Sequence, residues 1–165
     1  MRNKIFALTR TIVFGAAFGS LWLWFLPRWI ADGKGTLLRP IWSPGGLLLM
    51  AIGAAFVLPS MFQFAWLGHG TPAPFDPPRR LVIRGPYRWV RNPMYVGMGL
   101  LMAGEGILLP SIRREMFAAV VLFWLLTTAF VMLYEERALR RRFGEEYESY
   151  CRHVRRWIPR LTPFD

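Results

Sequence analysis

Four long apolar runs with almost no charge divide the sequence. Residues 11–26, 40–75 and 116–134 carry no Asp, Glu, Lys or Arg, and residues 94–112 carry only Glu105. A helix needs about 20 consecutive apolar residues to cross the hydrocarbon core of a bilayer. The runs therefore predict an all-α polytopic membrane protein with about four transmembrane helices. We expect these helices near residues 5–27, 44–67, 94–111 and 116–134.

The segments between the apolar runs predict how the helices are connected. Residues 68–78 hold four prolines and two glycines, a composition that excludes a continuous helix. Only residues 110–114 separate the last two helices, which should form an antiparallel hairpin. Beyond Tyr134 we expect a charged cytoplasmic extension of the last helix through Arg142, followed by a short surface helix over residues 145–152.

The net charge of +11 comes from 19 arginines and two lysines against ten acidic residues. Nucleic acid is a common partner of so basic a chain, but these charges lie between the apolar runs, and we expect no nucleic-acid partner. With the N-terminus inside, 16 basic residues lie on the inner side and five in the outer loops. This asymmetry predicts that both termini are cytoplasmic, in what we expect to be a bacterial inner membrane. The inner arginines would lie against anionic membrane lipids.

The few cysteine and histidine residues do not form the patterns of a metal site or a disulfide. Cys151 is the single cysteine, and His69 and His153 are far apart in the sequence. We therefore expect no metal site and no internal disulfide. The sequence does not indicate an oligomeric state.

Arg84 to Tyr95 combine three arginines with three aromatic residues where the third apolar run begins. Asn92 and Pro93 are suited to the N-cap and first positions of a helix. The free N–H groups of a helix N-terminus attract anions, and Arg88 and Arg91 would reinforce that attraction. Alternatively, the arginines are positive-inside anchors and the aromatic residues lie at the membrane interface.

Glu135 and Glu136 are adjacent carboxylates where the last apolar run ends. Negative charge at a helix C-terminus opposes the helix dipole, so the pair needs a cation nearby. Arg137, Arg140 and Arg142 would supply it as surface salt bridges. Alternatively, a ligand supplies an ammonium group or ribose hydroxyls.

Three further residues of the third run allow two interpretations each. Gly97 and Gly99 either permit close helix packing or leave room for a flat adenine ring. Glu105 lies about three turns into the helix, which predicts a position near mid-membrane. A carboxylate at that depth is a candidate functional group, and the alternative is a structural hydrogen bond.

Two blocks of the sequence resemble a known superfamily. The stretch Gly85-Pro86-Tyr87-Arg88-Trp89-Val90-Arg91-Asn92-Pro93-Met94-Tyr95-Val96-Gly97 resembles the Gly-Pro-Tyr-x-x-x-Arg-His-Pro-x-Tyr-x-Gly signature of the isoprenylcysteine carboxyl methyltransferase and phospholipid methyltransferase superfamily. Glu135-Glu136-Arg137 and Phe143 to Tyr147 resemble its second block. The length of 165 residues predicts one membrane domain over residues 1–165, with N-terminal helices and a loop over 5–78. The resemblance covers residues 79–159 and implies a cofactor-binding core there.

The resemblance also implies S-adenosyl-L-methionine as the methyl donor, bound at the cytoplasmic side of the last helices. Arg91 and Glu105 become catalytic candidates, Glu105 as the membrane-depth residue able to accept a proton from an amine. The residues implied in cofactor binding are Arg79, Arg80, Leu81, Val82, Tyr87, Asn92, Pro93, Met94, Tyr95, Gly97, Gly99, Glu135 and Glu136.

Two departures from the superfamily pattern bear on the acceptor. Asn92 replaces the usual His, which removes any imidazole chemistry. Val131 stands where the prenylcysteine enzymes carry a substrate-binding Arg. The resemblance therefore implies a lipidic or membrane-soluble acceptor, with a phospholipid amine slightly favoured over an isoprenylcysteine-like carboxylate or a thiol. The alternative from another class is a small non-enzymatic membrane protein whose arginines bind anionic lipid.

Overall fold

A computed structural model describes residues 2–63 and 80–164 of the chain, with side chains from residue 9 onward in the first helix. Its secondary structure over these residues is helical. Arg79 and the expected loop over residues 68–78 lie outside the described residues. Helix α1 (Arg2–Ser20) passes through a π-helical turn (Leu21–Phe25) into α2 (Leu26–Gly33).

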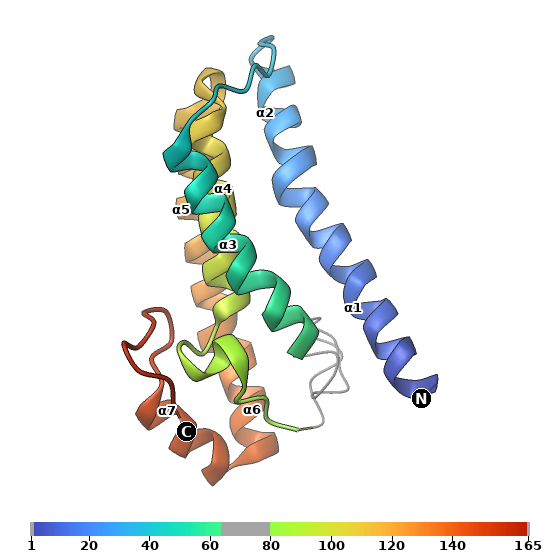
Figure 1. Cartoon of the computed structure of the whole chain (residues 1–165), viewed down its shortest axis with the longest axis vertical. Coiled ribbons are helices and arrows are strands. Elements are labelled where there is room, and N and C mark those ends of the chain that lie inside the picture. Colours follow the sequence, from blue (N-terminus) through green and yellow to red (C-terminus); the bar gives the residue numbers. More distant parts are fainter. Residues whose placement is uncertain (1, 64–79, 165) are drawn as a thin grey trace.

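The remaining membrane helices form the centre of the bundle (Figure 1). These are α3 (Pro44–Gln63), α4 (Pro93–Leu108) and α5 (Arg113–Phe130). A second π-helical turn (Val131–Glu135) joins α5 to α6 (Glu136–Phe143), and α7 (Glu145–His153) follows. Two 3-10 turns, Gly85–Arg88 and Pro110–Ile112, precede α4 and α5.

The expected membrane helices are confirmed. Among the described residues, three helices are long and apolar enough to cross a membrane, over Thr9–Gly33, Pro44–Gln63 and Pro110–Phe143, and Pro93–Leu108 is a shorter apolar helix. The chain is thus an all-α polytopic integral membrane protein. The third helix ends three residues earlier than expected, at Leu108, because Pro110 disfavours helical geometry at the residue before it.

The α3–α4 seam, defined by Gly46, Gly53, Gly97 and Gly104, brings two backbones into contact. A Cβ atom built on Gly97 would lie 2.5 Å from the carbonyl oxygen of Gly53, and one on Gly104 would lie 2.6 Å from that of Gly46. Small residues permit such close approach of membrane helices. The seam therefore fixes the position of α4 along the axis of α3.

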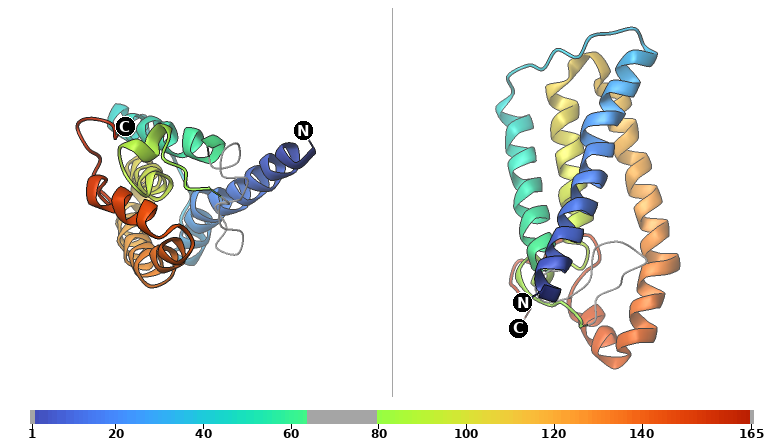
Figure 2. Two further views of the ribbon diagram at one scale, coloured as in Figure 1. Left: turned by 90° about the horizontal axis from the view of Figure 1, so that it is seen from below. Right: turned by 90° about the vertical axis from the view of Figure 1, so that its right-hand side faces the viewer.

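The opposite side of α4 packs through large side chains. Met98, Met102 and Phe123 form a buried cluster, against which Phe18 and Trp22 of the first helix pack. The Trp22 and Phe123 rings meet edge to face, with centroids 5.2 Å apart. The N-terminal half of α1 diverges from the other helices, and both chain termini lie at the same end of the molecule (Figures 1 and 2).

A third packing unit lies at that end, below the membrane helices. Tyr147, Tyr150 and Val154 form its buried core. Residues 155–164, here called the C-terminal strap, run back along residues 88–91. The backbone N–H of Arg91 donates to the Arg155 carbonyl at 3.0 Å, and that of Phe164 donates to the Arg88 carbonyl at 2.9 Å. The strap therefore fastens the segment that leads into α4.

Candidate functional site

A cavity of about 560 Å³ lies where α4, α5 and α6 meet the segment before α4. Its wall toward α1 and α5 is apolar, with Phe14, Phe18, Leu126 and Phe130 among its residues. Its other end carries the polar groups. The structure brings together ten of the predicted site residues in this wall: Leu81, Val82, Tyr87, Arg91, Asn92, Pro93, Met94, Tyr95, Glu135 and Glu136.

Glu135 and Tyr95 form one polar contact of the cavity wall. The Tyr95 hydroxyl donates a hydrogen bond to Glu135 Oε2 at 3.3 Å. Within the described part of the chain, this is the only hydrogen bond or ion pair of the Glu135 carboxylate. Glu135 ends the π-helical turn, a type of distortion that is common at functional sites. A half-buried carboxylate thus faces the cavity, and no cation of the described residues pairs with it.

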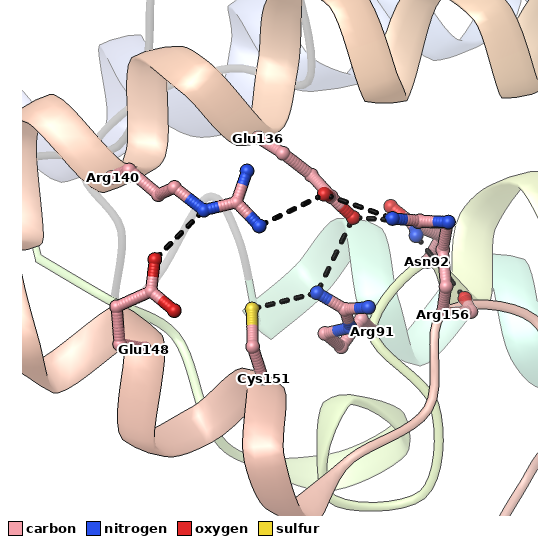
Figure 3. A network of polar contacts seen from close by, with 7 residues as sticks. All are labelled: Arg91, Asn92, Glu136, Arg140, Glu148, Cys151 and Arg156. Carbon is pink, nitrogen blue, oxygen red and sulfur yellow. Dashed lines mark hydrogen bonds and ion pairs between the residues drawn. The ribbon is translucent and has the colours of Figure 1, made fainter.

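Glu136 has entirely different surroundings (Figure 3). It is 2% exposed, and Arg156 binds it through two N–H groups, at 2.6 Å to Oε1 and 3.0 Å to Oε2. Arg140 and Arg91 approach it to 3.3 Å each. Of the three arginines expected as partners of the glutamate pair, only Arg140 has that role for Glu136. The other two partners come from distant parts of the sequence, where spacing alone cannot indicate them.

Arg91 links the cavity wall to α7. Its Nη1 donates to Cys151 Sγ at 2.6 Å in addition to its ion pair with Glu136. Its Nε is buried without a hydrogen-bond partner among the described residues. Cys151 is a site neighbour that sequence analysis missed, since a lone cysteine carries no motif.

Asn92 takes the predicted N-cap position of α4, but its side chain does not cap the helix. It donates instead to the backbone carbonyl of Arg156 at 3.1 Å. The first turn of α4 therefore has no side-chain cap on its N–H groups. Pro93, Met94 and Tyr95 of that turn line the cavity.

The tyrosines behind the site are buried and neutral. Burial raises the pKa of Tyr87 well above its usual value, and also that of Tyr150. The Tyr150 hydroxyl therefore stays protonated, and it donates a hydrogen bond to the Tyr87 carbonyl oxygen at 2.7 Å. Leu81 and Ile83 pack against this tyrosine core.

Four predicted site residues do not line the cavity: Arg80, Gly97, Gly99 and Glu105. Arg80 is exposed. Gly97 lies in the α3–α4 seam, and a Cβ on Gly99 would lie 2.9 Å from Trp124 Nε1. Both glycines thus occupy helix-packing positions.

Glu105 lies in the last turn of α4, where its carbonyl accepts from the N–H of Leu109 at 3.0 Å. It is thus about three turns from the start of the helix, as expected, and near its C-terminal end because α4 stops at Leu108. Its Oε2 is buried without a hydrogen-bond partner in the described part of the chain. Arg28 of α2 is the charged group that acts on it electrostatically.

Sequence analysis also missed Trp157 of the strap. Its ring meets those of Tyr95 and Trp124 edge to face, with centroids 6.4 Å and 5.0 Å apart. Trp157 therefore holds the strap against the two helices that flank the cavity. The sequence feature that could have indicated this contact is the presence of an aromatic residue beyond the last membrane helix.

Family comparison agrees with this arrangement. Residues 42–146 match the phospholipid methyltransferase family, a span that runs from just before α3 into α7 and includes the first motif block and Glu135-Glu136-Arg137 of the second. Comparison with curated proteins and with solved structures gives no match. The family match covers more than half of the chain and confirms the resemblance. The chain therefore belongs to the phospholipid methyltransferase family of membrane methyltransferases.

Proposed function

We propose that this protein transfers a methyl group from S-adenosyl-L-methionine to a lipidic or membrane-soluble acceptor. The observation that carries the proposal is the composition of the cavity. One end holds the Glu135 carboxylate, with which no cation of residues 2–63 and 80–164 pairs, and the wall toward α1 and α5 is apolar. A polar reactant and a lipid tail are therefore both accommodated in one space.

The residues present fit the methyl donor. The cavity volume is within the usual range of small-molecule sites, about 300–1,000 Å³. The donor's amino acid end carries an ammonium and a carboxylate. Glu135 is suited to the ammonium, and Arg91 with the first turn of α4 is suited to the carboxylate. When bound there, the sulfonium donor supplies an activated methyl group.

The chain's own residues would orient the reactants and exclude water. The Tyr95 hydroxyl fixes one oxygen of the Glu135 carboxylate. The Tyr95 ring offers an aromatic face to a cation, a contact of about 0.5–2 kcal/mol. Apolar side chains such as Phe18 and Phe123 keep water from the reacting groups. Holding acceptor and donor in one orientation is the main contribution to the rate.

The cavity also bears on the acceptor. Val131 is 1% exposed and lines the cavity at the position where prenylcysteine enzymes carry an arginine. A carboxylate acceptor would lack that cation, which leaves a phospholipid amine slightly favoured. Glu105 does not line the cavity, and we assign it no step in this proposal. We further propose that both termini face the cytoplasm of a bacterial inner membrane, as the distribution of basic residues predicts.

Calorimetry with S-adenosylhomocysteine on the purified protein tests donor binding. We expect Glu135→Gln to weaken binding about tenfold or more, since hydrogen bonds to charged groups contribute about 1.5–3 kcal/mol. Glu148→Gln is the matched control, because Glu148 pairs with Arg140 outside the cavity and should leave affinity unchanged. Absence of binding by the parent protein would refute the proposal and favour a non-enzymatic lipid-binding protein.

The acceptor is tested by methyl transfer from labelled donor to a lipid extract, to phosphatidylethanolamine and to a panel of thiols and carboxylates. Mass spectrometry of the product identifies the modified atom. We expect label in a lipid fraction and none in a water-soluble thiol.

A further inference from the structure

The adjacent residues Glu135 and Glu136 have opposite surroundings, although the family resemblance implies one role for both. We propose that Glu136 is a positioning residue that holds Arg91 in the cavity wall. Arg91 then receives an anionic oxygen of a reactant, and Glu136 itself contacts no ligand. The anion is the carboxylate of the methyl donor or the phosphate of a phospholipid acceptor. This inference rests on the proposed function, because it concerns the same cavity.

The carboxylate of Glu136 has no capacity left for a ligand. A carboxylate accepts about four hydrogen bonds through its two oxygens. Arg156 Nε and Arg91 Nη1 approach Oε1, while Arg156 Nη2 and Arg140 Nη2 approach Oε2. The side chain is also 3% exposed, so a ligand would have to displace an arginine to reach it.

The charges of this cluster do not cancel. Arg91, Arg140 and Arg156 stand against Glu136 and Glu148, which leaves one positive charge in excess. Arg156 is bound by both oxygens of Glu136, and Arg140 also pairs with Glu148 at 2.8 Å. Arg91 has one ion pair, at 3.3 Å, and a hydrogen bond from its Nη1 to Cys151 Sγ. The uncompensated charge therefore belongs to Arg91.

Arg91 is also the member of the three that lines the cavity. Its side chain is 11% exposed, and its Nε lacks a partner within the described residues. A buried guanidinium with an unmet donor is costly unless an anion completes it. Because the uncapped first turn of α4 follows directly, backbone N–H groups lie next to the same space.

A double-mutant cycle tests whether Glu136 acts through Arg91. S-adenosylhomocysteine affinity is measured by calorimetry for Glu136→Asp, Arg91→Ala and the double variant, below the unfolding temperature of each. The shorter Asp keeps the charge but withdraws the support of Arg91, and we expect about fivefold weaker binding. In the Arg91→Ala background the same change should have no further effect. Independent, multiplying losses would mean that Glu136 contacts the ligand, and would overturn the proposal.

Two further variants keep the test informative if Glu136→Asp does not fold. Cys151→Ala removes the other support of Arg91 and should weaken binding about twofold to threefold, again only when Arg91 is present. Arg140→Ala is the matched control, because Arg140 touches Glu136 but does not line the cavity. It should leave affinity within about twofold. A Cys151→Ala loss that persists without Arg91 would contradict the proposal.

The source of the anion is resolved by the choice of ligand. Loss of S-adenosylhomocysteine affinity in Arg91→Ala, with unchanged affinity for 5′-methylthioadenosine, assigns the anion to the donor carboxylate. Unchanged affinity for both, with a raised KM for phosphatidylethanolamine, assigns it to the lipid phosphate. Any other result with unchanged affinity overturns the proposal. If the parent protein fails to bind S-adenosylhomocysteine, the proposed function fails instead.

Discussion

The two sides of α4 are packed in different ways. Toward α3, glycines place backbone against backbone, so that no side chain can adjust at the contact. Toward α1 and α5, the contact runs through Phe, Trp and Met side chains that have rotatable bonds. The α3–α4 seam thus fixes the position of the α4 N-terminus, while the opposite side leaves the space of the cavity. Rigid support and an adaptable wall come from opposite faces of one short helix.

The largest effect should come from adding one methyl group to the seam. In Gly97→Ala the new Cβ would lie 2.5 Å from the Gly53 carbonyl oxygen and 2.7 Å from Val57, so the two helices must separate. We expect the free energy of unfolding in detergent to fall by about 2–3 kcal/mol, as for an overpacked core. Thermal unfolding measures the change. Gly45→Ala is the control, since nothing lies within 4 Å of its Cβ. Equal stability of the two variants would show that the seam is not tight.

An intermediate effect is expected from the aromatic side. Trp157→Ala removes two edge-to-face contacts, with Tyr95 and with Trp124. Each such pair contributes about 0.5–1.5 kcal/mol, so we expect a loss of about 1–3 kcal/mol and faster proteolysis of the strap. Trp42→Ala, at a residue that is 82% exposed, should change neither measurement. If the strap of Trp157→Ala resists proteolysis as well as that of the parent protein, its backbone hydrogen bonds alone are enough to hold it in place.

The smallest effect is expected where α1 meets α3. A Cβ on Gly15 would overlap the terminal methyl group of Met61, which is the far end of a flexible side chain. We expect Gly15→Ala to change the free energy of unfolding by less than about 0.5 kcal/mol, because Met61 can move aside. Thermal unfolding beside Gly97→Ala provides the comparison. A loss as large as that of Gly97→Ala would show that a flexible side chain relieves such an overlap no better than a backbone does.

The membrane helices were predictable because hydrophobic length is a local property of the sequence. The short connection after Leu108 and the N-cap position of Asn92 followed from proline and asparagine at defined places. Of the partners of Glu136, Arg140 was expected, but Arg91 and Arg156 were not, since both are distant in the sequence and Arg156 reaches Glu136 only when the strap folds back. The two π-helical turns have no sequence signature. Glu105 lies about three turns into α4, as expected, but α4 is shorter than its apolar run and Glu105 therefore falls in its last turn.

The site was predictable to the same extent. The motif residues around Tyr95 and Glu135 lie together because each flanks the inner end of a membrane helix. The seam glycines were harder to interpret, since helix packing and room for a ligand both call for small residues. Only the backbone distances decide that Gly97 faces α3.

The C-terminal strap sets an order of events during synthesis. A ribosome makes α4, α5 and α6 before residues 155–164, so these helices enter the membrane while the strap is still absent. In that interval Asn92 lacks the Arg156 carbonyl, and Glu136 lacks the arginine that binds both of its oxygens. The nascent chain thus passes through a stage with inserted helices and an unfinished pocket. These contacts must wait until residues 155–164 have been made, and a chain that stops before Arg156 would lack all of them.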